Sequence, residues 1–404
     1  MLGAFVLIML SALYTAQGLR IDRSQVENFA PQEPIRIADE LINERFAGTS
    51  FLDVVIDTDE PEGLLRADRM AKLVELQRYM ESLDHIEISV GITDYLALLH
   101  QAINELEDSD RVLPDDDDAI AQYLLVYEVS GDPTDFEEEI DSAYQSALIR
   151  GVLDSVHFSK TRDTVEMMQS YIDREFNEPG MRATLGGDVN ITYHWMSRLE
   201  SSHFQGVALS LVMVVGMAIA AFRSLSAGLL AVVPVTFTII MIYALMAGFG
   251  VYLEPATSMF AAISVGVGVD FAIHLVDRLR IALRLNSDDL PAAIAMAVPG
   301  TARACFFNAA ALGIGFSVML ASGLPMLQRF GGLVASAAVA SFLIGLIVVP
   351  ACYAAALALK RQLGVTPAPA KAAAKSLALL LGILVILPAE RAVAESTTGL
   401  EIAT

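Results

Sequence analysis

An ionisable pair lies inside an apolar stretch of this sequence. The stretch from Ala261 to Arg284 is long enough to cross a bilayer, yet it contains Asp270, with His274 four residues later. A carboxylate at the centre of a membrane helix costs about 2.5–3.5 kcal/mol on insertion scales. Residues at i and i+4 share a helix face, and both of these groups can exchange protons. The spacing predicts one proton-relay site; the alternative is an aspartate that is satisfied by a neighbouring helix and serves packing alone.

The residues around this pair suggest how other helices approach it. Gly266 and Gly268 precede the aspartate, and the lack of side chains there lets another helix pack closely. Asn308 lies in the following apolar stretch, where its amide is costly unless it is hydrogen-bonded. We expect Asn308 to be a polar neighbour of Asp270 and part of the proton relay, with ordinary interhelical packing as the alternative.

The composition separates a charged region from an apolar one. Of the 404 residues, 54% are hydrophobic, which is typical of an integral membrane protein with a sizeable soluble part. The net charge is -22, but residues 20–200 hold 40 acidic and 15 basic side chains, while the rest of the chain carries a net charge of +3. The sequence therefore predicts an acidic, water-exposed domain joined to a membrane domain. Phosphate binding needs a basic patch, so nucleic acid is not an expected partner.

Residues 20–200 alternate between strand-like and helix-like patterns. The expected order is strand, helix, strand, repeated once: 50–58, 62–83, 85–90, then 146–155, 161–176 and 182–186. Two β-α-β units of similar length predict an α/β domain with a ferredoxin-like, split β-α-β layout. In the acidic connection between them, Asp115–Asp118 is read as the first turn of a helix, because the ligand pattern of a calcium-binding EF-hand is absent.

The remaining segments are apolar. Residues 1–19 are expected to form a first transmembrane helix, although the core of a secretory signal is the alternative. Within 201–360, five further spans are expected near 203–222, 225–248, 254–280, 301–322 and 328–357, with a short surface helix at 291–298. Residues 361–404 are expected to be a linker followed by a signal-peptide-like or additional transmembrane segment, or the remnant of a fused second protein.

The charges between the spans predict the orientation. Seven basic residues fall at alternate ends of the spans: Arg223, Arg278, Arg280, Arg284, Arg303, Lys360 and Arg361. The opposite turns hold Glu254 and Arg329. Positively charged loops are usually cytoplasmic. Residues 20–200 are then extracytoplasmic, which means periplasmic if the chain sits in a bacterial inner membrane.

The sequence offers little for enzymatic chemistry. No nucleophile–base pattern, phosphate-binding loop or zinc-protease motif is present, and His157, His194 and His203 lack the spacing of metal ligands. The two cysteines, Cys305 and Cys352, both lie in apolar runs, so residues 20–200 can form neither a disulfide nor a thiolate metal site. We therefore expect no enzyme activity, no cofactor and no bound metal.

The order of these segments, and a GxxxD motif in the fourth of six helices, resemble one half of a resistance–nodulation–division (RND) superfamily exporter. The chain looks like the lipid-exporting branch, which includes the mycobacterial membrane protein large (MMPL) transporters, hopanoid exporters and Patched-like proteins. The matching residues are Gly266–Phe271 with His274, the run Pro325–Gly332, and Val349-Pro350; the segment 46–64 resembles the start of the porter domain. The resemblance covers about residues 1–360, and the single copy is most similar to the C-terminal half.

This resemblance implies export of a hydrophobic or amphipathic, lipid-like substrate from the cytoplasmic membrane, driven by the proton-motive force. It also implies membrane lipids, protons and a second half-transporter or a second copy of the chain as partners. Many relatives have a tyrosine after the aspartate, where this chain has Phe271, so His274 is expected to substitute. The alternatives are a lipid-binding module that resembles a sterol-sensing domain, and an inactive, truncated exporter.

Overall fold

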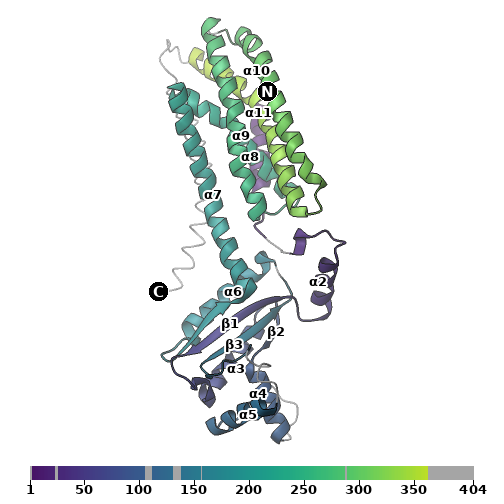
Figure 1. The fold of residues 1–404 in the computed structure, drawn as a ribbon. Coiled ribbons are helices and arrows are strands. Elements are labelled where there is room, and N and C mark those ends of the chain that lie inside the picture. The colour runs from purple at the N-terminus through teal and green to yellow at the C-terminus, as the bar shows by residue number, and fades with distance from the viewer. Residues whose placement is uncertain are drawn as a thin grey trace. The chain divides into compact units, whose positions relative to one another are not determined.

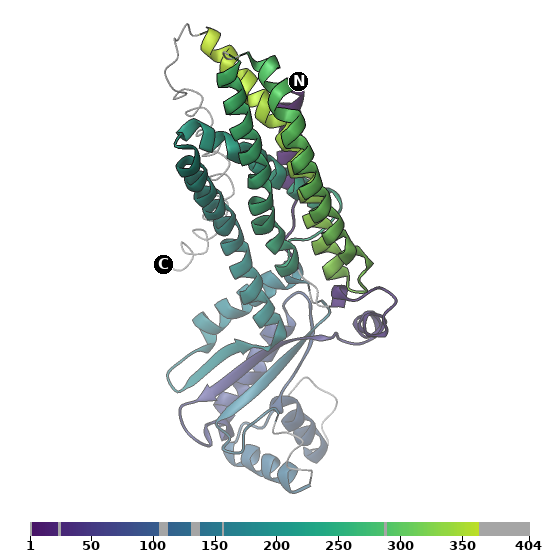
Figure 2. The same cartoon turned by 45° about the horizontal axis from the view of Figure 1, so that its top comes forward.

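The chain consists of two compact units. The computed structural model describes residues 2–22, 26–104, 112–130, 138–155, 157–286 and 289–362 (Figures 1 and 2). One unit comprises Met1–Ile21 and Arg198–Thr404 and is called the helical unit below; the other is Asp22–Ser197, called the α/β unit. Most of the segment 361–404, for which we expected a linker and a further apolar element, lies outside the described residues.

The α/β unit is built on a four-stranded antiparallel sheet in the order β2-β3-β1-β4. The strands are β1 (Ser50–Thr58), β2 (Ile86–Val90), β3 (Ser146–Leu153) and β4 (Met181–Gly186). The central strand β1 places Val54 opposite Ile149 of β3 and Leu185 of β4. This order brings the two β-α-β units together with their first strands in the middle, so the expected split β-α-β fold is confirmed.

The alternation of side chains along β1 determines which face of the sheet is covered. Leu52, Val54 and Ile56 are fully buried, whereas Phe51 and Val55 point to the opposite, partly exposed face. The buried face packs against α3 (Ala67–Glu81) and α6 (Phe158–Tyr171), which together with the strands form one continuous core. A π-helical turn (Ile172–Phe176) follows α6, and a short 3-10 turn (Gly63–Leu65) precedes α3.

Shorter helices complete the α/β unit. They are a 3-10 turn (Val26–Asn28), α2 (Pro34–Arg45), α4 (Ile92–Asn104) and α5 (Asp117–Ser130). The acidic run before α5 forms a helix start, as expected, with Asp117 and Asp118 in the first turn. The carboxylate of Asp117 also accepts a 2.7 Å hydrogen bond from the backbone N–H of Ala67, so it caps the beginning of α3.

The helical unit contains five helices that are long and apolar enough to cross a membrane, within the described residues. They are α7 (Gly187–Phe222), which begins in the α/β unit, α8 (Leu225–Gly248), α9 (Pro255–Leu285), α10 (Leu290–Ser317, extended to Ala321 by a 3-10 turn) and α11 (Pro325–Gln362). The shorter α1 (Leu2–Ala16) packs against α8, with Ala12, Ile240 and Ala244 buried at the contact. The expected architecture, a helical membrane protein with an α/β domain, is confirmed.

Helix α9 is the central element of the helical unit. It lies beside α8, α10 and α11 (Figure 1), and one apolar cluster joins Val235 and Ile239 of α8, Phe260 and Val265 of α9, and Ala337 of α11. Burial of such side chains between helices leaves little freedom for α9 to rotate about its axis, because each contact is close-packed. The direction in which each residue of α9 points is therefore determined.

One expected boundary is wrong. The sequence suggested a separate surface helix at 291–298 before a span that starts near 301, but α10 runs without a break from Leu290 to Ser317 and contains Pro299. A proline removes one backbone hydrogen bond and usually ends a helix in water. In membrane helices neighbouring helices and local adjustments satisfy the freed carbonyl, so the helix continues.

Candidate functional site

The candidate site lies on a side of α9 that none of the helices in the described residues covers. Exposed positions recur every three to four residues along this helix, and we call them the open stripe: Met259, Ala262, Gly266, Asp270, His274, Asp277, Arg278 and Ile281. The residues between them, such as Val269 and Phe271, are buried against the other helices. A period of three to four residues means that the open stripe is one continuous face of the helix.

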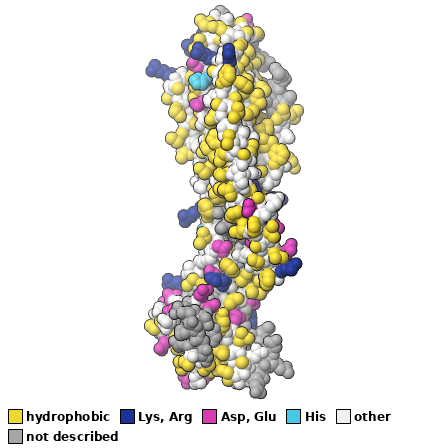
Figure 3. All heavy atoms as spheres, turned by 45° about the vertical axis from the view of Figure 1, so that its right-hand side comes forward, with side chains coloured by type: hydrophobic (Ala, Val, Ile, Leu, Met, Phe, Trp, Pro, Cys, Tyr) yellow, Lys and Arg dark blue, Asp and Glu magenta, His cyan; other side chains and the backbone are white. Residues whose placement is uncertain are grey.

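Asp270 and His274 lie one turn apart on the open stripe, as their spacing predicts. Within the described residues, neither side chain forms a hydrogen bond or an ion pair, and both are exposed. Figure 3 shows a histidine and acidic side chains among mainly hydrophobic side chains on the surface of the helical unit. The described part of the chain thus places no polar partner beside either side chain, and their joint role as a proton relay stays a prediction.

The two glycines before Asp270 face different surroundings. A Cβ added at Gly268 would lie 3.1 Å from Ser341 Oγ of α11 and 3.4 Å from a methyl carbon of Val235 on α8, so this glycine permits close packing inside the helical unit. A Cβ added at Gly266 would meet no atom within 4 Å. Gly266 is part of the open stripe, and within the described residues no helix packs closely against it.

Asn308 lies on an exposed side of α10, next to the exposed rings of Phe306 and Phe307. No hydrogen bond joins Asn308 to Asp270 in the described part of the chain, so its place in the proton relay also stays a prediction. Phe271, at the position where relatives carry tyrosine, is buried and stacks edge-on against Phe342 of α11 at 6.3 Å. Its ring thus points away from the open stripe.

Two polar pairs in the helical unit were not predicted from the sequence. His203 Nε2 of α7 and the hydroxyl of Tyr243 on α8 are 2.7 Å apart, and both residues are buried. Glu254, which precedes α9, is also buried and lies 3.3 Å from Arg329 of α11. The sequence gave a signal for each pair: His203 begins an expected span, and Glu254 and Arg329 are opposite charges expected at the same end of the bundle.

Glu254 has a second role at the start of α9. Its carboxylate accepts a hydrogen bond from the first turn, and Thr257 Oγ1 in turn accepts a 2.9 Å hydrogen bond from the backbone N–H of Glu254. Such reciprocal capping satisfies donors that a helix start leaves unpaired. The cap and the Arg329 contact together hold the beginning of α9 against α11.

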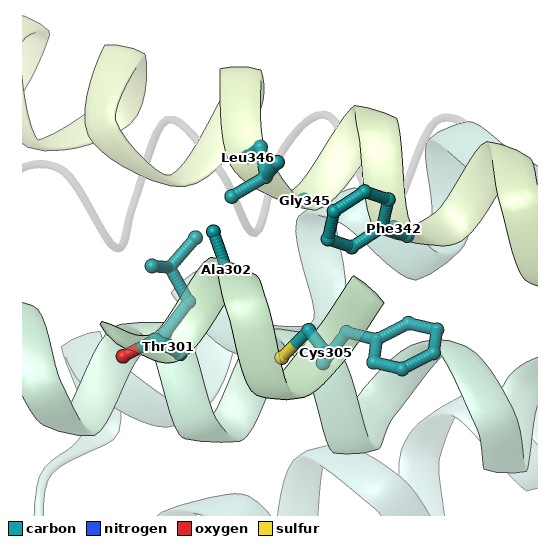
Figure 4. A pocket seen from close by; sticks show the side chains of 8 residues that line it. Thr301, Ala302, Cys305, Phe342, Gly345 and Leu346 are labelled. Atoms are coloured by element: carbon teal, nitrogen blue, oxygen red, sulfur yellow. The ribbon is translucent and has the colours of Figure 1, made fainter. Parts of the chain in front are cut away.

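A small apolar pocket opens where α9, α10 and α11 meet. Its labelled lining in Figure 4 comes from α10 (Thr301, Ala302, Cys305) and α11 (Phe342, Gly345, Leu346). The volume is about 10 Å³, which is at the lower limit of the roughly 10–15 Å³ that a cavity needs to hold a single water. In this arrangement the pocket holds neither an acyl chain nor a sterol, so it offers no support for the lipid-sensing alternative.

The chain combines an α/β domain of the split β-α-β type with five spanning helices, and the central helix α9 carries a carboxylate at its middle. This combination defines a membrane transporter of the RND type. The MMPL family model matches residues 141–376, more than half of the chain, and the chain therefore belongs to the MMPL family. It is also 20% identical over 295 residues to a Methanocaldococcus jannaschii protein described as a membrane protein, a match that covers 72% of this chain and 73% of that protein.

Proposed function

We propose that this MMPL-family transporter is one half of a proton-driven exporter of a hydrophobic or amphipathic, lipid-like substrate. The observation that carries the proposal is Asp270 on the open stripe of α9. It is 15 residues from both Pro255 and Leu285, so it lies about 22 Å from each end of the helix. A group in that position is remote from water at either membrane surface unless an assembled transporter provides a path.

The residues of the open stripe favour association with a partner helix that covers Asp270. A charge that faces lipid at this depth is costly, whereas one that faces a helix bundle or a water-filled path is tolerated. Ala262 and Gly266 are four residues apart on the same stripe, a spacing at which small residues let two membrane helices approach closely. A second copy of the chain would present the same stripe, with His274 and Arg278 available to face the carboxylate of Asp270.

The proposed cycle uses the two charge states of Asp270. The neutral acid is compatible with a closely packed interface, and the carboxylate favours an interface that admits water. Alternation between them, with His274 as a relay one turn away, would link proton movement to helix packing. The driving force would be the proton gradient, and the substrate would enter from the membrane.

The proposed orientation places the α/β unit outside the cytoplasm. It is supported by Arg280, whose guanidinium lies over the ring of Phe222 at 5.4 Å. The C-terminal ends of α7 and α9, where Arg223 and Arg280 lie, are therefore on the same side of the membrane. Cysteines introduced at Glu60 and Asp289, in a chain without Cys305 and Cys352, should react with an impermeant maleimide from opposite sides of the membrane. Reaction from the same side would contradict this orientation.

The direct functional test is lipid export from proteoliposomes. The full chain would be reconstituted with a fluorescent phospholipid, and export would be measured after a pH gradient is imposed. Asp270→Asn cannot titrate and should reduce export by at least about 100-fold, the scale on which a positioned proton-transfer group acts. Asp277→Asn, on the same stripe but nearer the end of α9, is the matched control and should retain export. Equal export by the parent and Asp270→Asn would refute the proposed coupling.

A further inference from the structure

Helices α7 and α8 share a buried pair of ionisable side chains that the Asp270 site does not involve. His203 and Tyr243 are each 9% exposed, and the imidazole Nε2 lies 2.7 Å from the phenol oxygen. Three aromatic contacts surround the pair: His203 with Phe204 at 5.3 Å, Phe204 with Tyr243 at 6.4 Å, and Tyr243 with Phe260 of α9 at 5.6 Å. A polar pair enclosed by aromatic rings in a membrane span is a candidate functional site.

The chemistry of the pair allows it to take up one proton. A neutral imidazole carries one N–H and one lone pair, and a phenol can donate or accept. When Nε2–H donates to the Tyr243 oxygen, the lone pair is on Nδ1, which has no hydrogen-bond partner within the described residues. A proton added at Nδ1 gives the imidazolium without breaking the bond from Nε2 to Tyr243.

The position of the pair gives it access to protons from one side of the membrane. His203 is 19 residues from Phe222, and Tyr243 is 18 residues from Leu225, so both lie about 27–29 Å from the turn that joins the two helices. The hydrocarbon core is about 30 Å thick. The pair thus lies near the membrane surface opposite that turn, where water is available. Asp270 is deeper.

Few other ionisable groups affect this position. Within the described residues, Tyr243 is the only ionisable side chain that hydrogen-bonds or stacks against His203. On α7 itself Glu200 is three residues earlier and shares the same side of the helix. From α9 and α11 the nearest end carries Glu254 and Arg329, which pair with each other. Among these groups, Glu200 is the carboxylate nearest to His203 along the chain.

We propose that His203 and Tyr243 form a second proton-binding site, which controls the packing of α7 against α8. In the neutral state the imidazole and phenol hold the two helices together inside an apolar cluster. Protonation places a positive charge in this apolar cluster, and a buried charge favours an arrangement that admits water. Proton uptake at this site consequently loosens the contact between α7 and α8. The site does not depend on the role proposed for Asp270.

The test follows the protonation of His203 in the intact chain. The full chain, labelled with nitrogen-15 in its histidine rings, would be placed in lipid nanodiscs and titrated by NMR between about pH 3 and 8, a range that extends to acid because burial disfavours the imidazolium. The His203 signal is identified by its loss in His203→Gln, and His194→Gln, an exposed histidine of the same helix, is the matched control. We expect His203 to bind one proton within this range. An imidazole that keeps one protonation state throughout would overturn the proposal without the need for any further variant.

The contribution of Tyr243 is tested in the same way. Tyr243→Phe keeps the ring contacts but removes the acceptor of the charged hydrogen bond, so the proton affinity of His203 should fall about tenfold or more. His194 should titrate unchanged. If His203 binds its proton equally well in the parent and in Tyr243→Phe, Tyr243 is not part of the proton-binding site, and its contact with His203 is only an interhelical hydrogen bond. In Asp270→Asn the His203 titration should persist, so that failure of the proposed export mechanism and failure of this site give different results.

Discussion

At the scale of single residues, Asp22 shows how a buried carboxylate organises the start of a helix. It is 5% exposed and accepts hydrogen bonds from the backbone N–H and the hydroxyl of Ser159, at 3.3 and 2.6 Å. His157 Nδ1 lies 3.4 Å from the same carboxylate. The hydrogen bond to Asp22 raises the pKa of His157, with Glu27 adding to the effect and Lys160 opposing it.

This raised pKa predicts a pH-dependent start of α6. A histidine whose folded pKa is raised contributes stability below its unfolded pKa of about 6.5, and that stability is lost as the pH rises through the folded value. Hydrogen exchange of the peptide Phe158–Tyr171 in the full chain, corrected for intrinsic rates, should therefore show protection that falls above about pH 6.5. Asp22→Asn should abolish this pH dependence. The same decline in both chains would contradict the assignment to the Asp22–His157 pair.

Residue types and spacing predicted some of the candidate site. Asp270 and His274 were identifiable because a charge inside an apolar run stands out, and their common face follows from helix geometry. The pairing of His203 with Tyr243 was not predictable, since the two residues are 40 positions apart and meet only when α7 packs on α8. The exposure of Asp270 was also not predictable, because it depends on how the described helices pack around α9.

At the scale of elements, the two glycines of α9 offer a matched pair of substitutions. Gly268→Val introduces side-chain atoms where even a Cβ is 3.1 Å from Ser341 Oγ, and overpacking of this kind typically costs about 1–3 kcal/mol. The thermal stability of the detergent-solubilised chain should therefore fall. Gly266→Val fills open space and should leave the stability of the single chain unchanged. A larger loss for Gly266→Val than for Gly268→Val would contradict the packing described for α9.

Elements with a clear period were predictable, and those decided by their surroundings were not. Strand β1 spans Ser50–Thr58, as its alternation indicates, because one face is fully buried and the other partly exposed. The order of the strands followed from two β-α-β units. In α10 the local rule failed: Pro299 suggested an end, but the environment of a membrane bundle maintains the helix through it.

At the scale of the whole molecule, the open stripe predicts that two chains associate through α9. Gly266→Cys, in a chain whose own cysteines are replaced by serine, should form a disulfide-linked dimer under mild oxidation, because small residues there permit close approach. Leu209→Cys, on an exposed part of α7, is the control and should cross-link far less. Gel electrophoresis without reductant measures both. Equal cross-linking at the two positions would argue against a specific α9 interface.

The most direct test of proton-coupled export through Asp270 is the movement of protons that accompanies the substrate. Proteoliposomes with a pH-sensitive dye inside would contain the full chain, with or without a lipid-like substrate in the membrane. The account predicts a substrate-dependent proton flux in the parent chain and none in Asp270→Asn, while His274→Gln reduces the flux but retains part of it. A substrate-dependent flux in Asp270→Asn equal to that of the parent would contradict the account.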